Sequence, residues 1–307
     1  VQCVFWTQSI TVIRIVPCMG FNDVHAHTVK FVRGAGMAEA KLATTVEVCA
    51  ETLRSCAAAV EGGAHRIELC SALSEGGLTP SLAFIRAAVQ LAAGTSTQVG
   101  VLIRPRAGDF VYSAEEVAIM EADIGLAVDA GAAFIVSGAL AADGCLDEAS
   151  LRRLIAACGP DVPFVCHRCV DVSVDPLTAF YNALQLGAAR VLTSGAAASA
   201  LEGHGTLQAM LAGAQGDATK LCAAGGITAA TVGDLLYRVP GLQQVHGSVR
   251  VSGPSGCQHQ PDPPVYMAAE RHNTPQSEHS RKDSTFESVT AFVAAAQCAE
   301  LKGSQPT

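Results

Sequence analysis

The sequence predicts an α/β fold of the (β/α)8 TIM-barrel class, built as a single domain. Short apolar runs with strand character recur eight times between residues 44 and 248, and stretches with helical spacing separate them. Most runs end on Glu, Cys, Arg, Ser, His or Thr, and most are followed by a turn that contains Gly. A barrel of this class takes about 250 residues, which fits a chain of 307 residues as one domain with additional ends.

The first half of the predicted barrel contains four strand–helix units. Its strands are expected at Thr44–Cys49, His65–Cys70, Gln98–Arg104 and Ala133–Ser137, and its first helix at Thr52–Glu61. Thr79 and Pro80 begin the second helix, because Pro is tolerated in a first helical turn. Ser113 and Glu116 have the spacing of a capping box, which predicts the start of a third helix that ends near Gly131.

The second half repeats the pattern and closes the barrel. Its strands are expected at Phe164–His167, Arg190–Thr193, Lys220–Ala224 and Gln243–His246. The helix before the first of these strands is expected to start at Asp147. The helices between them are expected to start at Asp175, about Ser199 and Thr228. Helical spacing returns over Phe286–Leu301, which we interpret as the eighth helix.

Two segments fall outside this alternation. Residues 1–42 precede the first strand and form an uncertain N-terminal extension, so the barrel domain is expected over 43–302. Residues 250–284 are rich in Pro, Ser, His, Gln and charged side chains and show little periodicity. This composition predicts a long loop or a disordered insert within the domain.

Composition restricts the class of protein. The formal net charge is −8 and no block of basic residues occurs, which argues against nucleic acid as a partner. No stretch reaches the roughly 18 uninterrupted apolar residues of a membrane helix, so we expect no membrane partner. The twelve cysteines are scattered, several of them within predicted core strands. This distribution favours reduced thiols and a cytoplasmic location over a disulfide framework.

Cysteine and glutamate alternate along the first two strands. Glu47 and Cys49 share one face of the first strand, and Glu68 and Cys70 share one face of the second. If both faces point inward, two thiols lie beside two carboxylates at the top of the barrel. Two soft thiolates suit Cu(I), whereas harder ions prefer the carboxylates. The alternative is that both cysteines are small core residues, because free Cys is commonly buried for packing.

Charged side chains follow two other strands. Arg104 and Arg106 leave the third strand, and the guanidinium geometry of two such arginines indicates a small anionic ligand that carries carboxylate or phosphate. His167 follows the fifth strand and is a candidate general acid or base. Together with Glu47 and Glu68 it would form the proton-transfer set of an enzyme. A structural cluster of salt bridges would explain the same charges.

Glycine-bearing turns follow the last two strands, at Gly225-Gly226 and at Gly247-Ser248. In many barrels these two loops bind a phosphate through backbone N–H groups, and glycine permits the close approach that this requires. We therefore expect the anionic ligand at this end. Short glycine turns are also common in barrels that bind no anion.

Taken together, these segments resemble the CutC copper homeostasis family. The matching segments include Glu47-Val-Cys49, Gly62–Ser71, Leu73–Ser81, Ile103–Phe110, Met120–Ile124, His167-Arg168, Arg190–Gly195 and His246-Gly-Ser248. The resemblance covers about residues 44 to 250 and, more weakly, the last helix. It implies a TIM barrel that forms a homo-oligomer (a dimer or a tetramer), lies in the cytoplasm, with the nucleus as a second compartment in a eukaryote, and binds the copper ion Cu(I) through Cys49 and Cys70.

The chain departs from the family pattern after Ser248, where the family's usual Met-rich and Arg-Asn turn is missing, and at two places before it. His167-Arg-Cys-Val-Asp171 stands where the family has His-Arg-Ala-Phe-Asp, and Ala224 replaces the first glycine of a three-glycine turn. The departures at His167–Asp171 and Ala224 fall at the expected anion-binding end. Our first hypothesis is a copper homeostasis protein that binds Cu(I) in the cytoplasm. The alternative is a barrel enzyme, a lyase, isomerase or hydrolase, that acts on a small phosphorylated or carboxylated metabolite.

Overall fold

The computed structural model describes residues 44–257, 259 and 280–302, so the predicted N-terminal extension lies outside the described part. Eight parallel strands pair in sequence order and close into a barrel, with β8 hydrogen-bonded to β1. The strands are β1 (Thr45–Ala50), β2 (Arg66–Leu69), β3 (Gln98–Leu102), β4 (Phe134–Ser137), β5 (Phe164–Cys166), β6 (Arg190–Thr193), β7 (Leu221–Ala223) and β8 (Gln244–Gly247). The predicted (β/α)8 fold is confirmed.

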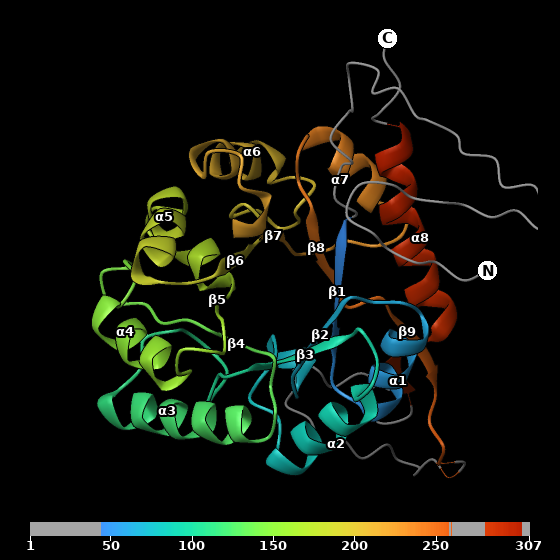
Figure 1. Ribbon diagram of the computed structural model, residues 1–307, viewed down its shortest axis with the longest axis horizontal. Coiled ribbons are helices and arrows are strands. Elements are labelled where there is room, and N and C mark those ends of the chain that lie inside the picture. The colour runs from blue at the N-terminus through green and yellow to red at the C-terminus, as the bar shows by residue number, and fades with distance from the viewer. Residues whose placement is uncertain (1–43, 258, 260–279, 303–307) are drawn as a thin grey trace, which may run out of the picture. The chain divides into compact units, whose positions relative to one another are not determined.

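Helices alternate with the strands and surround them (Figure 1). They are α1 (Leu53–Glu61), α2 (Leu82–Ala92), α3 (Ala114–Asp129), α4 (Glu148–Ala157), α5 (Pro176–Leu186), α6 (His204–Gly213), α7 (Val232–Arg238) and α8 (Phe286–Lys302). Short 3-10 helices occur at η1 (Leu73–Glu75), η2 (Arg168–Val172) and η3 (Ala218–Lys220). None of the helices in the described ranges is long and apolar enough to cross a membrane.

Side-chain caps fix several of the predicted helix starts. The Ser113 hydroxyl accepts from the Glu116 N–H while the Glu116 carboxylate accepts from the Ser113 N–H, so the predicted capping box is present. Three starts differ from the prediction. α2 begins at Leu82, because the Ser81 hydroxyl, and not Thr79, accepts from the N–H of Phe84 and caps the helix. α6 begins at His204 rather than near Ser199, and α7 begins at Val232 because Thr228 donates its N–H to the Thr231 hydroxyl in a separate turn.

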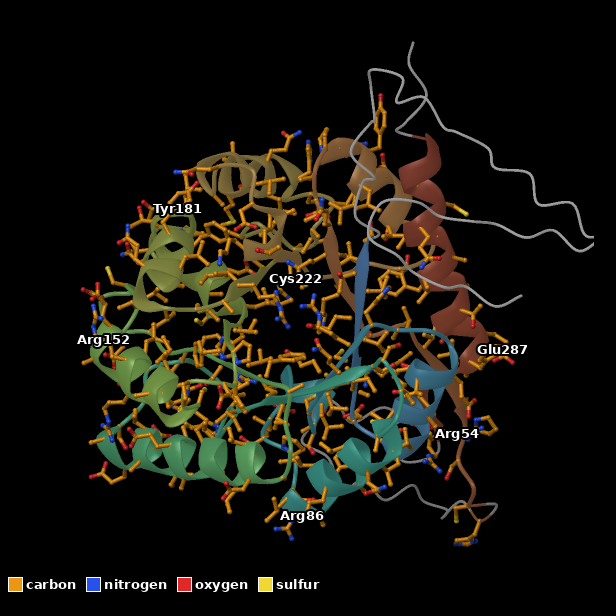
Figure 2. The ribbon with its side chains drawn as sticks, viewed as in Figure 1. Arg54, Arg86, Arg152, Tyr181, Cys222 and Glu287 are labelled. Carbon is orange, nitrogen blue, oxygen red and sulfur yellow. The ribbon has the colours of Figure 1, made fainter. Side chains whose placement is uncertain are left out.

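Burial divides each strand into two faces. Val46 and Val48 of β1 point into the apolar layer between strands and helices, while the alternate residues face the barrel interior. The interior contains a second apolar cluster, which consists of Cys70, Leu102, Phe134, Val136, Val165, Leu192, Cys222 and Ala224. Figure 2 shows Cys222 in the middle of the barrel, whereas Arg86, Arg152 and Glu287 lie at its outer edge.

The ends of the segment 250–284 differ from the prediction of a loop or disordered insert. Strands β9 (Arg250–Pro254) and β10 (Ser280–Ser284) pair as an antiparallel ribbon. Both strands are polar, so the alternation that reveals a half-buried strand is missing from their sequences. The ribbon is held by hydrogen bonds from Ser284, whose N–H donates to the Ser55 hydroxyl at 2.9 Å and whose hydroxyl donates to the Ser248 carbonyl at 2.8 Å.

Candidate metal and anion site at the carboxyl end of the barrel

A cavity of about 580 Å³ opens where the strands end. Its lining comes from the ends of β1, β2 and β8 on one side and from the loops after β3, β5 and β7 on the other. This is the end of the barrel at which the fold carries its functional groups. The volume lies in the range of pockets for small molecules.

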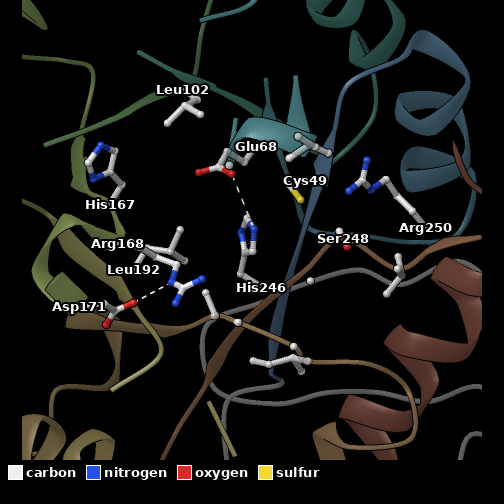
Figure 3. A pocket seen from close by; sticks show the side chains of 18 of the residues that line it. Cys49, Glu68, Leu102, His167, Arg168, Asp171, Leu192, His246, Ser248 and Arg250 are labelled. Atoms are coloured by element: carbon white, nitrogen blue, oxygen red, sulfur yellow. Dashed lines mark hydrogen bonds and ion pairs between the residues drawn. The ribbon is translucent and has the colours of Figure 1, made fainter. Parts of the chain in front are cut away.

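Three potential metal ligands meet at one side of this cavity. The Cys49 thiol, a Glu68 carboxylate oxygen and a ring nitrogen of His246 all lie within 4.8 Å of one another. They stand on adjacent strands, because β1 pairs with β2 and with β8. The three residues are 5%, 6% and 8% exposed, so a bound ion would be largely shielded from water. Figure 3 shows Glu68 and His246 between Cys49 and the opposite wall.

An ion-pair network beneath the cluster fixes the orientation of the His246 ring. Nδ1 of His246 donates to Oε1 of Glu47 at 2.9 Å, and Oε2 of Glu47 also pairs with Arg66 at 3.1 Å and Arg190 at 2.9 Å. Burial on its own raises the pKa of Glu47, but the His246 hydrogen bond and the charges on Arg190 and Arg66 outweigh it and lower this pKa to about 2. Glu47 is therefore a carboxylate at neutral pH, and it holds the Nδ1–H of the ring.

The other ring nitrogen of His246 is directed to Glu68, with 3.7 Å between Nε2 and Oε2. Burial on its own lowers the pKa of His246, but the Glu68 carboxylate and side-chain hydrogen bonds to Cys49 and Glu47 raise it well above its usual value. Burial raises the pKa of Glu68, and the charge on His246 offsets this increase only in part. A proton on Nε2 has to leave before this nitrogen can bind a metal ion, and Glu68 stands beside it to receive that proton.

His167 lies across the cavity from Cys49 (Figure 3). Its Nδ1 accepts the N–H of Cys169 at 3.1 Å and so caps η2. Burial, assisted by the charge on Arg104, lowers the pKa of His167 to about 3. His167 is therefore a neutral imidazole at pH 7. Arg168 pairs with Asp171 at 2.7 Å, and both residues belong to η2, which His167 caps.

Residues 44–251 match the CutC family. The chain belongs to the CutC family. The CutC protein of Xanthomonas campestris pv. campestris (strain B100) is 42% identical over 222 residues, which cover 71% of this chain and 88% of that protein. The copper homeostasis protein cutC homolog of Homo sapiens is 41% identical over 222 residues, covering 72% and 79%. A crystal structure of CutC from Streptococcus agalactiae superposes with a TM-score of 0.63 at 31% identity, covering 67% of this chain and 98% of that one.

The two cysteines that the CutC resemblance implicates occupy different surroundings. Cys49 belongs to the three-ligand cluster, whereas Cys70 neither belongs to that cluster nor lines the cavity. The Cys70 thiol donates to the Ala50 carbonyl at 3.6 Å and packs in the interior apolar cluster. Burial first, and then the proximity of Cys49 and Glu68, raise the pKa of Cys70 well above its usual value.

The structure separates the three residues that we predicted for proton transfer. Glu68 and His167 both line the cavity, but Glu47 does not, because its carboxylate is 1% exposed and occupied by two arginines and His246. The alternative enzyme function required Glu47, Glu68 and His167 to face one substrate, and only Glu68 and His167 line the cavity. No substrate in the cavity could reach the Glu47 oxygens without passing these partners.

The structure also separates the two arginines predicted to bind an anion. Arg104 lines the cavity, whereas Arg106 does not and instead pairs with Glu116 at 2.6 Å and Asp109 at 3.0 Å. The four residues predicted from the glycine turns, Gly225, Gly226, Gly247 and Ser248, all line the cavity. Gly225 needs to be glycine because its φ is +99° and a Cβ there would lie 3.0 Å from Cβ of Ser194.

His246 is the site residue that we did not assign from the sequence. The available signal was its position at the end of the last apolar run, preceded two residues earlier by Gln244 on the same strand face. Its meeting with Cys49 depends on the closure of β8 against β1. That contact joins the two ends of the barrel, and no local periodicity reveals it.

Proposed function

We propose that this CutC-family protein serves copper homeostasis by binding Cu(I) at the carboxyl end of its barrel, with the Cys49 thiolate and Nε2 of His246 as ligands. One observation carries the proposal, namely the meeting of the ligand atoms of Cys49, Glu68 and His246 within 4.8 Å. The human relative is named a copper homeostasis protein, and the copper role comes to this chain through that relationship.

The chemistry of the donor set supports Cu(I) over harder ions. Thiolate and imidazole are ligands that Cu(I) accepts at low coordination number, whereas Mg²⁺ and Ca²⁺ require several oxygen donors. The cluster offers one carboxylate, Glu68, whose elevated pKa suits it better as a proton acceptor than as a ligand. A metal-binding His usually donates its second ring N–H to a carboxylate, and the Glu47–His246 hydrogen bond has this arrangement.

The cytoplasm belongs to the proposal as the compartment, because Cu(I) and free thiols both persist under reducing conditions. The ten cysteines in the described ranges are free, and seven of them are buried. The Cu(I) ligands are therefore expected to be available without prior reduction. The proposal also includes the homo-oligomer that the CutC resemblance implies. Light scattering of the purified chain tests it separately.

The experiment is an anaerobic Cu(I) titration against a competing chelator, with thiolate-to-Cu(I) absorbance as a second signal. Cys49→Ser and His246→Gln should each abolish tight binding, because each removes one donor. Cys70→Ser should retain it, because Cys70 lies outside the cluster. Cys145→Ser is the matched control for adventitious binding, since Cys145 is an exposed thiol. Tight binding that survives in Cys49→Ser would sink the proposal.

A further inference from the structure

The wall of the cavity that lies across from Cys49 presents a buried hydrogen-bond donor without an acceptor. Nδ1 of His167 accepts the Cys169 N–H, so it carries no proton. Because the ring is neutral, the proton must be on Nε2. Among the described residues nothing accepts from this Nε2–H, although His167 is only 5% exposed.

An unpaired buried donor is unusual and requires an explanation. Leaving one unsatisfied costs about 1–3 kcal/mol, and most buried polar groups in folded proteins have a partner. The His167 ring lines the cavity and packs against Phe110, with the ring centroids 4.9 Å apart. Its free N–H is therefore available to something inside the cavity that brings an acceptor atom.

The same wall contains a positive charge without a counter-charge. Arg104 is 6% exposed, and its guanidinium donates to the backbone carbonyls of Glu75, Gly77 and Gly108. No carboxylate in the described part of the chain forms an ion pair with it. The positive charge of Arg104 acts on the neighbouring His167 ring and contributes to the lowering of its pKa.

The other two arginines of the cavity differ from Arg104 in this respect. Arg168 pairs with Asp171, and Arg250 pairs with Glu51. The cavity thus contains two compensated arginines and one whose charge is balanced by no acidic side chain among the described residues. A buried charge of this kind is costly unless a partner arrives.

We propose that this cavity binds a small oxyanion, a phosphate or carboxylate group, that accepts a hydrogen bond from Nε2–H of His167 and lies against the positive charge of Arg104. The ligand brings acceptors and negative charge, which are the two properties that this wall lacks. The backbone of Gly225 and Gly226 lines the same cavity and can approach such a group closely. The volume of about 580 Å³ leaves room for the rest of a small metabolite.

This site is separate from the proposed copper ligands, so the two proposals fail independently. The test is calorimetric titration of the full-length, copper-free protein with inorganic phosphate and, in a second series, with succinate. We expect one saturable site for at least one of the two anions, and the tighter of them identifies the class of group. An absence of saturable binding for both anions overturns the proposal.

Two variants locate the anion. His167→Asn keeps an oxygen near the Nδ1 position to cap η2, since Asn is a good N-cap, but it has no group at the Nε2 position. It should weaken anion binding about tenfold, which corresponds to about 1.4 kcal/mol. Arg104→Gln should weaken binding at least as much. Arg106→Gln is the matched control, because Arg106 stands two residues away and does not line the cavity. Equal weakening in Arg104→Gln and Arg106→Gln would overturn the assignment.

A second measurement does not depend on the stability of any variant. Long-range proton–nitrogen NMR of the histidine rings should show His167 protonated at Nε2 and unprotonated at Nδ1 at pH 7. Addition of the bound anion should shift the Nε2 resonance with the same saturation curve as the calorimetry. A ring protonated at Nδ1, or an Nε2 resonance that ignores the anion, contradicts the proposal.

Discussion

Oε1 of Glu47 lies 2.9 Å from Nδ1 of His246 and fixes the ring so that Nε2 points to Glu68 and the cavity. The two residues are 199 positions apart in the sequence and directly paired in the β1–β8 register. The carboxylate is itself held by Arg66 and Arg190, so the orientation of the proposed copper ligand depends on a buried network of four charged groups.

Glu47→Gln should therefore weaken Cu(I) binding while leaving the Cys49 thiol in place. Loss of such an outer partner typically costs 10–100-fold in metal affinity, and chelator competition measures it. Glu121→Gln is the control, because Glu121 pairs with Arg153 on the exterior helices α3 and α4. An affinity that is unchanged in Glu47→Gln would show that the Glu47 carboxylate does not support Cu(I) binding through His246.

The same substitution should destabilise the fold, because two buried arginines would lose their carboxylate. Removing one partner of a buried ion pair costs about 3–5 kcal/mol. Denaturant unfolding at pH 7 measures this loss. Since the pKa of Glu47 is about 2, below the usual value of 4.5, its contribution is present above pH 4.5 and is lost as the pH falls toward 2. The difference between wild type and variant should shrink over that interval.

His167 should make the fold sensitive to acid at a higher pH than Glu47 does. Its pKa is about 3 in the folded chain against an ordinary value of 6.5, so the neutral ring favours the folded state above pH 6.5. That contribution is lost as the pH falls from 6.5 toward 3, and amounts to at most about 5 kcal/mol. His167→Asn should flatten this dependence in unfolding experiments between pH 7 and pH 4. Parallel curves for the two proteins would contradict the prediction.

Gly100→Ala should destabilise the barrel from inside. A Cβ at Gly100 would lie 2.0 Å from Cε2 of Phe134, a fully packed interior ring. Overpacking of this kind costs about 1–3 kcal/mol or more, which thermal unfolding would detect. Gly125→Ala is the matched control in α3, because a Cβ there meets nothing within 4 Å. It should stabilise the protein by about 0.5–1 kcal/mol through helix propensity.

Ser113→Ala should cost about 1 kcal/mol, because the Ser113 hydroxyl caps α3 in the box with Glu116. Chemical denaturation measures the loss. Ser173→Ala serves as a comparison, since its hydroxyl donates to the Val170 carbonyl and caps no α-helix. A smaller effect at Ser113 than at Ser173 would show that the exposed box contributes little.

The sequence was sufficient for the barrel, and the reason is periodicity. Alternation puts Glu47 and Cys49 on one face of β1, and the structure places Cys49 and Glu68 of the neighbouring strands in the lining of the cavity. Alternation does not predict the direction of side chains that lie beyond the end of a strand. β3 ends at Leu102, so Arg104 and Arg106 follow a turning backbone and take different directions. Cys70 comes just after the end of β2 at Leu69 and packs in the interior apolar cluster, not in the lining of the cavity.

Contacts across long sequence separations account for the rest. His246 meets Cys49 only because the barrel closes, and β9 pairs with β10 through backbone groups that leave no apolar pattern. The unpaired Nε2–H of His167 follows from a cap on η2, which was not expected at that strand end. These features depend on which backbone groups already have partners, and a single sequence does not encode that locally.

The pairing of β1 with β8 determines when, during and after synthesis of the chain, the metal site can form. Cys49 is translated about two hundred residues before His246, with Glu68 soon after it. A nascent chain that still lacks β8 therefore offers a thiol and a carboxylate but not the imidazole that completes the cluster. An ion bound by Cys49 of β1 and His246 of β8 would link the two strands. By mass action it would favour the closed barrel over any form in which these strands have separated. Loading of the site is thus expected only after β8 has been synthesised, and it would select those molecules in which β1 and β8 have already joined.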